Sequence, residues 1–181
     1  MPPDARTDGF AIRPVRPDDL DAVYEIAHRT GAAGEDATGL IEDRRLVGEL
    51  WAAPYVTLEP EHASVLVDAD DVPVGYVLGA LDSVAFEERC EREWWPALRE
   101  RHPLTPGGDR LDDLLIALIH NRWPRDPEVE GPYPSELHID LLPVAQGSGW
   151  GRRMMATVLR SLRAAGSPAV HLGTSAANTR A

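Results

Sequence analysis

The chain has 181 residues, of which 43% are hydrophobic, and this length and composition suffice for one domain with an ordinary core. Its 30 carboxylates against 18 basic residues give a formal net charge of −12, which argues against nucleic acid as the main partner because phosphate binding requires a clustered basic surface. All 18 basic residues are arginine, and the absence of lysine excludes a Schiff base, a pyridoxal phosphate anchor and a phosphate-loop lysine.

Cysteine content and hydropathy indicate the compartment. The single cysteine, Cys90, allows neither a disulfide framework nor a thiolate metal cluster. No apolar run reaches the roughly 18 residues of a membrane span, and residues 1–10 are polar, which predicts a loose tail rather than a signal peptide. We therefore expect a single cytoplasmic domain over residues 1–181 with no membrane partner.

The first third predicts a short strand and two helices. Residues 11–15 form a candidate strand, which Pro14 confines to a sheet edge or a strand end. A helix opens at Pro17–Leu20, with two acids in its first turn, and ends near Gly31. A second helix is expected to run through Leu40, Ile41, Leu46 and Leu50 to Pro54.

A hairpin is predicted next, with strands at His62–Asp68 and Val72–Gly79 on either side of an acidic turn. Gly75 and Gly79 in its second strand indicate bends or a close approach of backbone. The strand rhythm then stops, and a helical insertion is expected over residues 83–134.

Within the insertion, the pattern predicts one helix over residues 84–101 and another over residues 111–123. The final third predicts a strand, a glycine-rich turn, a helix and a second strand, at residues 137–142, 146–151, 152–165 and 169–172.

Charge is unevenly distributed along the chain. Residues 1–140 hold all 30 carboxylates and 13 of the arginines, which gives −17, whereas residues 141–181 hold five arginines and no carboxylate, which gives +5. An acidic body with a short basic end indicates a local anion site. A chance run in an arginine-rich composition is the alternative.

The strand, glycine-rich turn and helix near the end form an arrangement that binds phosphates, because turn amides and the positive helix end hold an oxyanion. Three known loops do not fit this segment. A Walker loop requires lysine, a dinucleotide fingerprint requires glycine where Arg152 stands, and a nucleophile elbow around Ser148 requires glycine where Gln146 stands.

The pattern that fits is Gln-x-x-Gly-x-Gly, at Gln146, Gly149 and Gly151. With its flanking strands and helix, it resembles the acetyl-CoA loop of the GCN5-related N-acetyltransferase family. Residues 12–20 are similar to that family's first strand and helix, and residues 74–79 to its third strand. The resemblance implies an α/β (α+β) fold with a mixed, mostly antiparallel sheet that is splayed at the cofactor strand, flanked by helices, and interrupted by the helical insertion between its third and fourth strands.

A more specific resemblance is to the acetyltransferase-like domain of eukaryotic O-GlcNAcases and its bacterial homologues. It is carried by residues 76–82, the region from Cys90 to Trp94, and residues 139–141. The eukaryotic members lack an intact cofactor loop, whereas this chain retains residues 146–151, which favours cofactor binding.

The resemblance implies direct transfer of an acetyl group from acetyl-CoA to the primary amine of a small molecule or peptide. Family members continue past the position of Asn178 into a helix whose tyrosine protonates the departing thiolate, and then into two more strands. This chain stops at Ala181, so we expect that helix and those strands to be missing. A pseudo-acetyltransferase that binds acetyl-CoA without catalysis, or a homodimer paired through an open sheet edge, are the alternatives.

Cofactor contacts follow from the resemblance by position. The acetyl-pantetheine arm is expected against the backbone of Leu141, Leu142 and Val144, with Asn178 on its other side. The pyrophosphate is expected on the amides of Gln146, Gly147, Ser148, Gly149, Trp150, Gly151 and Arg152. The amide of Leu141 is further expected to polarise the thioester carbonyl, which is the catalytic role of an oxyanion hole.

Direct transfer also requires a base near the thioester. His138 and Asp140 share one face of their strand. Asp140 falls beside the expected acetyl position and is assigned to substrate binding or base catalysis, with a structural aspartate as the alternative. His138 is a candidate for substrate binding or a core histidine. No third ligand accompanies this pair at a recognisable spacing, so no metal is expected.

Trp94 in the insertion, with Trp95, Glu91 and Glu93, is expected to form an aromatic and acidic wall over the acceptor site. Such a wall suits a cationic or sugar amine, and core packing of the aromatic rings is the alternative. By resemblance, Arg29, Thr30 and residues 34–36 border the same cleft.

Overall fold

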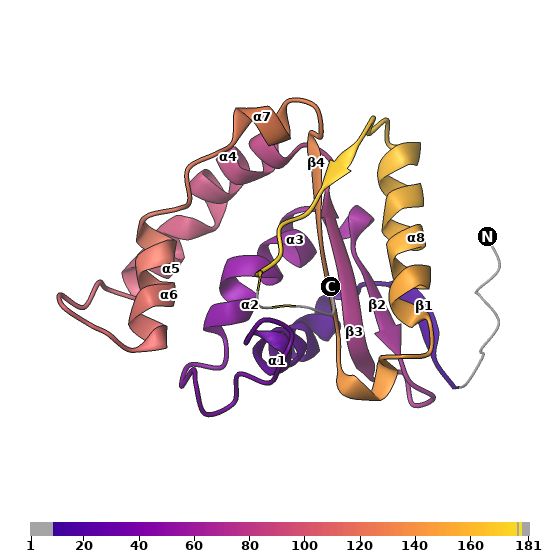
Figure 1. Ribbon diagram of the computed structural model, residues 1–181, viewed down its shortest axis with the longest axis horizontal. Helices are drawn as coiled ribbons and strands as arrows, with labels where there is room; N and C mark the ends of the chain where they lie inside the picture. Colours follow the sequence, from indigo (N-terminus) through magenta and orange to yellow (C-terminus); the bar gives the residue numbers. More distant parts are fainter. Residues whose placement is uncertain (1–8, 177, 179–181) are drawn as a thin grey trace.

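The centre of the molecule is a five-stranded sheet with the strand order β1-β2-β3-β4-β5 (Figure 1). The computed structural model describes residues 9–176 and residue 178. All neighbouring strands are antiparallel except the last pair, which is parallel, so the mixed and mostly antiparallel sheet is confirmed. The strands are β1 Ala11–Pro14, β2 Ser64–Val67, β3 Pro73–Ala80, β4 Ser135–Leu141 and β5 Val170–His171.

Helices cover both faces of this sheet and form the insertion at its side (Figure 1). The α-helices are α1 Leu20–Thr30, α2 Leu46–Trp51, α3 Ala53–Leu58, α4 Ser83–Glu93, α5 Trp95–Arg101, α6 Leu111–His120, α7 Pro127–Glu130 and α8 Trp150–Ala164. Within the described residues, three short 3-10 helices complete the secondary structure: η1 Pro17–Asp19, η2 Pro60–His62 and η3 Pro143–Ala145.

The predicted hairpin of β2 and β3 is confirmed. The carboxylate of Asp68 accepts the amides of Asp70 at 2.9 Å and Val72 at 3.0 Å, which fixes the acidic turn. β1 occupies the sheet edge and ends at Pro14, where a residue without an amide hydrogen removes no internal bond.

β3 is buried along residues 74–80 because α8 packs on one side and α1 and α3 on the other. Gly79 allows α8 to approach: a Cβ at that position would lie 2.9 Å from Cγ2 of Val158. A Cβ on Gly75 would lie 3.0 Å from the carbonyl oxygen of Asp140. Both glycines thus serve the close approach predicted for them.

The helix predicted from Leu40 to Pro54 is wrong at both ends. α2 begins only at Leu46, and after a break at Ala52 a separate helix, α3, continues to Leu58. The preceding segment is not helical because its amides bond elsewhere. The buried carboxylate of Asp112 in α6 accepts the amides of Glu42 and Asp43, which ties the segment to the insertion.

The insertion over residues 83–134 lies between β3 and β4 as predicted, but its helices are divided differently. The single helix predicted over residues 84–101 is two helices, α4 and α5, that meet at Trp94. Pro96 in the first turn of α5 has no amide hydrogen and clashes with a preceding helical turn, which explains the break. α6 ends at His120 rather than residue 123, and α7 follows, capped by Asp126.

A buried carboxylate fastens α5 to the body of the domain. Glu49 of α2 is 1% exposed in its side chain and forms an ion pair with Arg101 and a hydrogen bond of 2.8 Å with Nε2 of His102. A buried carboxylate requires such partners because an unpaired charge in the interior is costly. The insertion is therefore fixed to the domain through Glu49 and Asp112.

β4 and β5 separate soon after they pair. Only Ser135 with Val170 and Glu136 with His171 form their parallel register, and beyond these the C-terminal segment leaves the sheet (Figure 1). The predicted splay is present. It leaves residues 137–141 of β4 without a strand on that side among the described residues.

Candidate functional site

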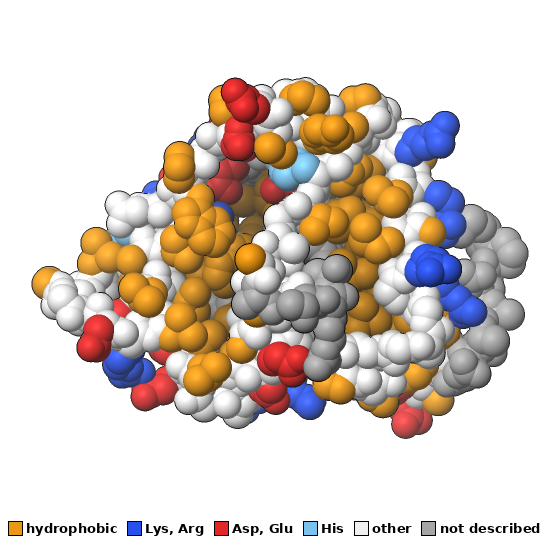
Figure 2. All heavy atoms as spheres, in the orientation of Figure 1, with side chains coloured by type: hydrophobic (Ala, Val, Ile, Leu, Met, Phe, Trp, Pro, Cys, Tyr) orange, Lys and Arg blue, Asp and Glu red, His pale blue; other side chains and the backbone are white. Residues whose placement is uncertain are grey.

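Two clefts meet beside the splayed strand β4. The large cleft, of about 940 Å³, lies between the insertion, α2, β4 and residues 171–175. The small cleft, of about 730 Å³, lies between β4, residues 32–35, the glycine-rich turn and Asn178. Thr30, Ala33 and Asp140 line both. Figure 2 shows the hollow of the large cleft, with hydrophobic side chains around it.

Asp140 occupies the junction of the two clefts. Its Oδ2 accepts a hydrogen bond of 2.6 Å from the hydroxyl of Tyr76 on β3. Burial raises the pKa of the Asp140 carboxyl from 3.8 to about 6, and hydrogen bonds from Tyr76 and Thr30 oppose that rise. A carboxyl with this pKa is ionised at neutral pH and can accept a proton more readily than an ordinary aspartate.

His138 and Glu136 precede Asp140 on the same face of β4, and all three line the large cleft. The imidazole of His138 packs on the ring of Tyr55 at 5.2 Å between centroids. Burial lowers the pKa of His138 to about 4, so the ring is neutral at physiological pH. The hydroxyl of Tyr55 donates a 2.6 Å hydrogen bond to Glu136.

The amide of Leu141 faces away from β3. Residues of an antiparallel pair alternate between bonding the partner strand and facing away from it. The amide of Leu142 donates to the carbonyl of Val74 at 2.9 Å, so its neighbour Leu141 belongs to the outward set. Leu141 also lines the small cleft.

The glycine-rich turn connects β4 to α8 through left-handed backbone. Gly147 has φ +79° and Gly149 has φ +85°, values that side chains of L-residues rarely adopt. Gly149 is the N-cap of α8. Gly151 has no such requirement, and a Cβ there would approach Cδ1 of Leu141 at 3.7 Å, in ordinary contact. Glycine at 151 therefore keeps the wall of the small cleft open.

The amides of the turn and of the first helical residues are available to bind an anion. No backbone carbonyl in the described part of the chain accepts the amides of residues 147–152, as expected at a helix N-terminus. Gln146 departs from the expectation: its amide donates to the carbonyl of Pro143 at 3.2 Å, while its side chain donates to the carbonyl of Leu141 at 2.8 Å. Gln146 therefore braces the turn against β4.

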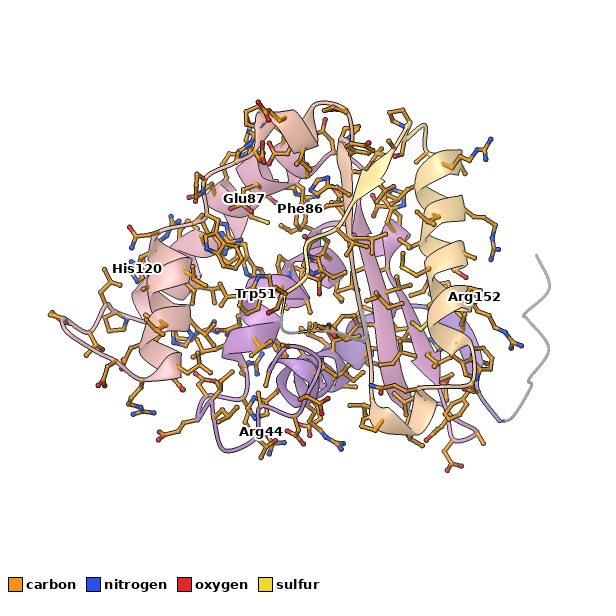
Figure 3. The ribbon with its side chains drawn as sticks, viewed as in Figure 1. Arg44, Trp51, Phe86, Glu87, His120 and Arg152 are labelled. Carbon is orange, nitrogen blue, oxygen red and sulfur yellow. The ribbon has the colours of Figure 1, made fainter. Side chains whose placement is uncertain are left out.

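The other residues predicted for the cofactor take different places. The ring of Trp150 is buried against Phe10, so only its backbone can meet a ligand. The side chain of Arg152 points outward from α8 (Figure 3). Among the described residues, Leu142, Val144 and Ser148 do not line the small cleft. The amide of Leu142 is also already bonded within the sheet.

Asn178 and a tight turn form the wall opposite β4. Ala32 and Glu35 exchange backbone hydrogen bonds of 3.0 and 3.1 Å, and the two residues between them have positive φ, 54° at Ala33 and 88° at Gly34. This is the geometry of a two-residue turn with both central residues left-handed. A Cβ on Gly34 would lie 3.1 Å from Nδ2 of Asn178, so the glycine also admits the asparagine.

Comparison with known proteins finds relatives that match most of the chain. A solved structure titled SsHAT is 42% identical, with a TM-score of 0.86 over 94% of this chain and 85% of that one. The O-GlcNAcase of Rattus norvegicus is 28% identical over 163 residues, which are 87% of this chain and 17% of that protein.

The chain belongs to the GCN5-related N-acetyltransferase family.

Within this acetyltransferase family it has an O-GlcNAcase-like relationship. The O-GlcNAcase of Mus musculus is 29% identical over the same share of the chain, and the chain spans about a sixth of the length of these curated relatives. The polyamine N-acetyltransferase of Drosophila melanogaster, at 19% identity and a TM-score of 0.51 over 94% of this chain and 79% of that one, shares the fold. No family model matches the chain.

The aromatic wall of this acetyltransferase domain differs from the predicted one. Trp94 does not line the large cleft, and its indole donates to the carbonyl of Glu49 at 3.0 Å. Glu91 and Glu93 pair with Arg99 and Arg89 on the outside of the insertion.

Trp95, also predicted for the wall, does line the cleft, and its indole donates to Glu87 at 3.1 Å. Trp51, Phe86 and Glu87, which the sequence did not single out, point into the open space between the insertion and the sheet (Figure 3). Pro96 was the sequence signal that could have revealed this arrangement. A helix that breaks before Pro96 has a different set of side chains facing the cleft than an unbroken helix.

The structure also shows where the other residues predicted to border the cleft lie. Thr30 lines both clefts, as expected, and Gly34 and Glu35 line the small one. Arg29 lies on the surface, 3.8 Å from Asp36. Within the described residues, no helix has the length and apolar character to cross a membrane. No group of three or more His, Cys, Asp or Glu side chains there is placed to hold a metal ion.

Proposed function

We propose that this domain is an acetyltransferase that moves the acetyl group of acetyl-CoA directly to a primary amine. The observation that carries the proposal is the meeting of two clefts at one carboxylate. An amine in the large cleft and a thioester in the small cleft would meet at their junction, where Asp140 is the titratable side chain that lines both. Membership of the N-acetyltransferase family supports the same reaction class.

The small cleft suits the cosubstrate. The amides of residues 147–152 and the N-terminus of α8 offer donors for a pyrophosphate. The outward amide and carbonyl of Ile139 on β4 offer hydrogen bonds to the pantetheine arm, and Asn178 lies across the cleft from them. When bound, acetyl-CoA supplies an activated thioester carbonyl.

Asp140 is the proposed base. The incoming ammonium must lose a proton before its nitrogen can attack, and the Asp140 carboxylate, with a pKa of about 6, can accept it. The carbon–nitrogen bond then forms as the carbon–sulfur bond breaks. The nitrogen loses a second proton as it becomes the amide nitrogen, and this proton neutralises the departing thiolate. The first proton, held by Asp140, is released to solvent, so the products are a neutral amide, a thiol and one proton.

Leu141 and the turn supply the remaining groups. The amide of Leu141 would donate to the carbonyl oxygen of the thioester as negative charge develops there, which is the stage at which an oriented donor contributes most. Gln146 holds the carbonyl of the same residue at 2.8 Å. The turn therefore braces the end of β4 next to this amide, in addition to offering donors to an anion.

Two measurements test the proposal. Isothermal titration calorimetry with acetyl-CoA at low ionic strength should show binding in a one-to-one ratio, and its absence would overturn the proposal. A thiol-release assay over amines and lysine peptides should then show release that depends on the acceptor. Tight binding without such release would leave the pseudo-acetyltransferase as the function.

A further inference from the structure

The large cleft is lined by five carboxylates, which differ in how they are neutralised. Glu87 pairs with Arg122 at 3.0 Å, and Glu130 pairs with Arg125 at 2.9 Å. Asp126 lies at the rim, where its side chain caps α7. The last two, Glu136 and Asp140, have no arginine partner among the described residues.

These two carboxylates lie at opposite ends of the cleft floor. They are four residues apart on one face of β4, and a strand rises about 3.3 Å per residue, so their separation is about 13 Å. Asp140 is at the junction with the small cleft. Glu136 is at the far end, with the Tyr55 hydroxyl at 2.6 Å and Nε2 of His171 at 3.8 Å.

An unpartnered hydroxyl lies at the end of the cleft where β4 begins. Ser83 is 5% exposed and lines the large cleft, and its Oγ has no hydrogen-bond partner among the described residues. Its amide donates to the carbonyl of Pro134 at 2.8 Å, which places it beside the start of β4. A buried hydroxyl without a partner is uncommon. Together, Glu136 and Ser83 offer acceptors to a group with several N–H donors.

The floor and wall between the two ends are aromatic. The ring of Tyr55 stands between His138, at 5.2 Å, and Phe86, at 4.3 Å between centroids. His138 is neutral because burial lowers its pKa to about 4. Trp51 and Phe86 point into the space above (Figure 3). This middle region suits an uncharged hydrocarbon chain better than a polar one.

We infer that the acceptor is a linear amine with a second cationic group at its far end, an ammonium or guanidinium held by Glu136 and Ser83. The inference rests on the proposed function and names the substrate class for the same site. The reacting amine at Asp140 loses its proton and is acetylated. The distal group keeps its charge and does not react. Because it must reach Glu136 while the amine is at Asp140, it selects substrates of a certain length.

A series of unbranched diamines, from diaminobutane to diaminodecane, tests this length directly against monoamines of equal length. With each carboxylate about 2.8 Å from its cation, the preferred nitrogen-to-nitrogen distance is about 8–13 Å. KM should pass through a minimum in that range. The matched monoamine should have a KM at least about tenfold higher, since a charged hydrogen bond is lost. Equal KM values for diamines and monoamines would overturn the inference.

The variant Glu136→Gln tests whether Glu136 binds the distal cation. The amide still accepts a hydrogen bond from Tyr55 but carries no charge. KM for the best diamine should rise about tenfold or more with little change in kcat, and KM for the monoamine should stay the same. Glu88→Gln, an equal loss of charge on the exposed side of α4, is the matched control. Equal effects of Glu136→Gln on both amine classes would contradict the assignment.

A binding measurement separates this inference from the proposed function. Calorimetric titration of the best diamine into the CoA-bound protein should show binding that Glu136→Gln and, less strongly, Ser83→Ala weaken, with melting temperatures recorded to verify folding. Diamine binding without thiol release would retain the cation site and reject catalysis. Thiol release with monoamines as efficient as diamines would retain catalysis and reject the cation site.

Discussion

The two clefts that meet at Asp140 differ in which part of the chain lines them, backbone in one and side chains in the other. The small cleft is built largely from backbone: two left-handed glycines, the outward amides of β4 and the N-terminus of α8. The large cleft is built from side chains contributed by α2, α4, α5, β4 and the segment after α6. A surface of backbone amides suits a ligand that is the same in every reaction, such as the cosubstrate. A surface of side chains can acquire a different acceptor specificity by substitution, without a change of fold. The comparison predicts that variants in the two clefts will separate cosubstrate affinity from acceptor affinity.

Asp140→Asn should produce the largest effect, because Asp140 belongs to both clefts. The amide can still accept a hydrogen bond from Tyr76 but cannot accept a proton from the amine, so kcat should fall about 10²- to 10⁴-fold. Steady-state kinetics measures the loss, and calorimetry should show unchanged affinity for acetyl-CoA. A kcat near that of the wild type would remove Asp140 from the mechanism.

Titration of Asp140 should appear in both activity and stability. Activity should rise with pH through about 6 as the carboxyl ionises. Stability should change in the opposite direction: between the unfolded value of 3.8 and about 6 the native state binds more protons, so unfolding free energy should fall as pH rises, by about 3 kcal/mol in total. Urea denaturation of wild type and Asp140→Asn across pH 4–7 measures it, and parallel pH profiles would contradict the assigned pKa.

Two glycines of the turn should respond differently to alanine. Gly149→Ala places a side chain at φ +85° and should destabilise the fold by about 1–2 kcal/mol. Gly151→Ala is helical and unstrained, and should raise stability by up to about 1 kcal/mol. It should nevertheless weaken acetyl-CoA binding at least about tenfold, because the methyl group enters the small cleft. Thermal melts and calorimetry measure the pair, and unchanged affinity in Gly151→Ala would place the cosubstrate elsewhere.

The adjacent tryptophans provide the smallest and most local test. Trp94→Phe loses a hydrogen bond to Glu49 outside the cleft, so it should cost about 1 kcal/mol of stability and leave acceptor KM unchanged. Trp95→Phe should cost a similar amount or more and also raise acceptor KM, because the ring lines the large cleft. If Trp94→Phe raised acceptor KM as much as Trp95→Phe, the acceptor would lie outside this cleft.

The same contrast between a cleft lined by backbone and a cleft lined by side chains explains what could be predicted from the sequence. A backbone site leaves a local signature, since its glycines and helix start are consecutive in the chain. Gln146, Gly149 and Gly151 therefore indicated the small cleft and the family. The sequence did not show that Gly147 also requires positive φ, or that the amide of Gln146 is already bonded to Pro143.

The large cleft left no such signature. Trp51, Phe86 and Glu87 belong to different helices, and only the packing of the insertion on α2 brings them together. The helix predicted over residues 84–101 lacked the break before Pro96, and Trp94 was assigned to the wall together with Trp95, although only Trp95 lines the cleft. The helix predicted from Leu40 failed for a similar reason, because the acceptor of its amides, Asp112, is distant in the sequence.

The turn at Ala32–Glu35 has a consequence for how binding energy is used. It borders both clefts, and Ala33 holds a left-handed conformation that costs an alanine roughly 1–2 kcal/mol. Reciprocal hydrogen bonds and the contact of Asn178 with Gly34 keep it there. Its conformational entropy is therefore lost when the chain folds and not when a ligand arrives. Each substrate meets a wall that is already in its final shape, and the energy of its contacts remains available for aligning the amine with the thioester.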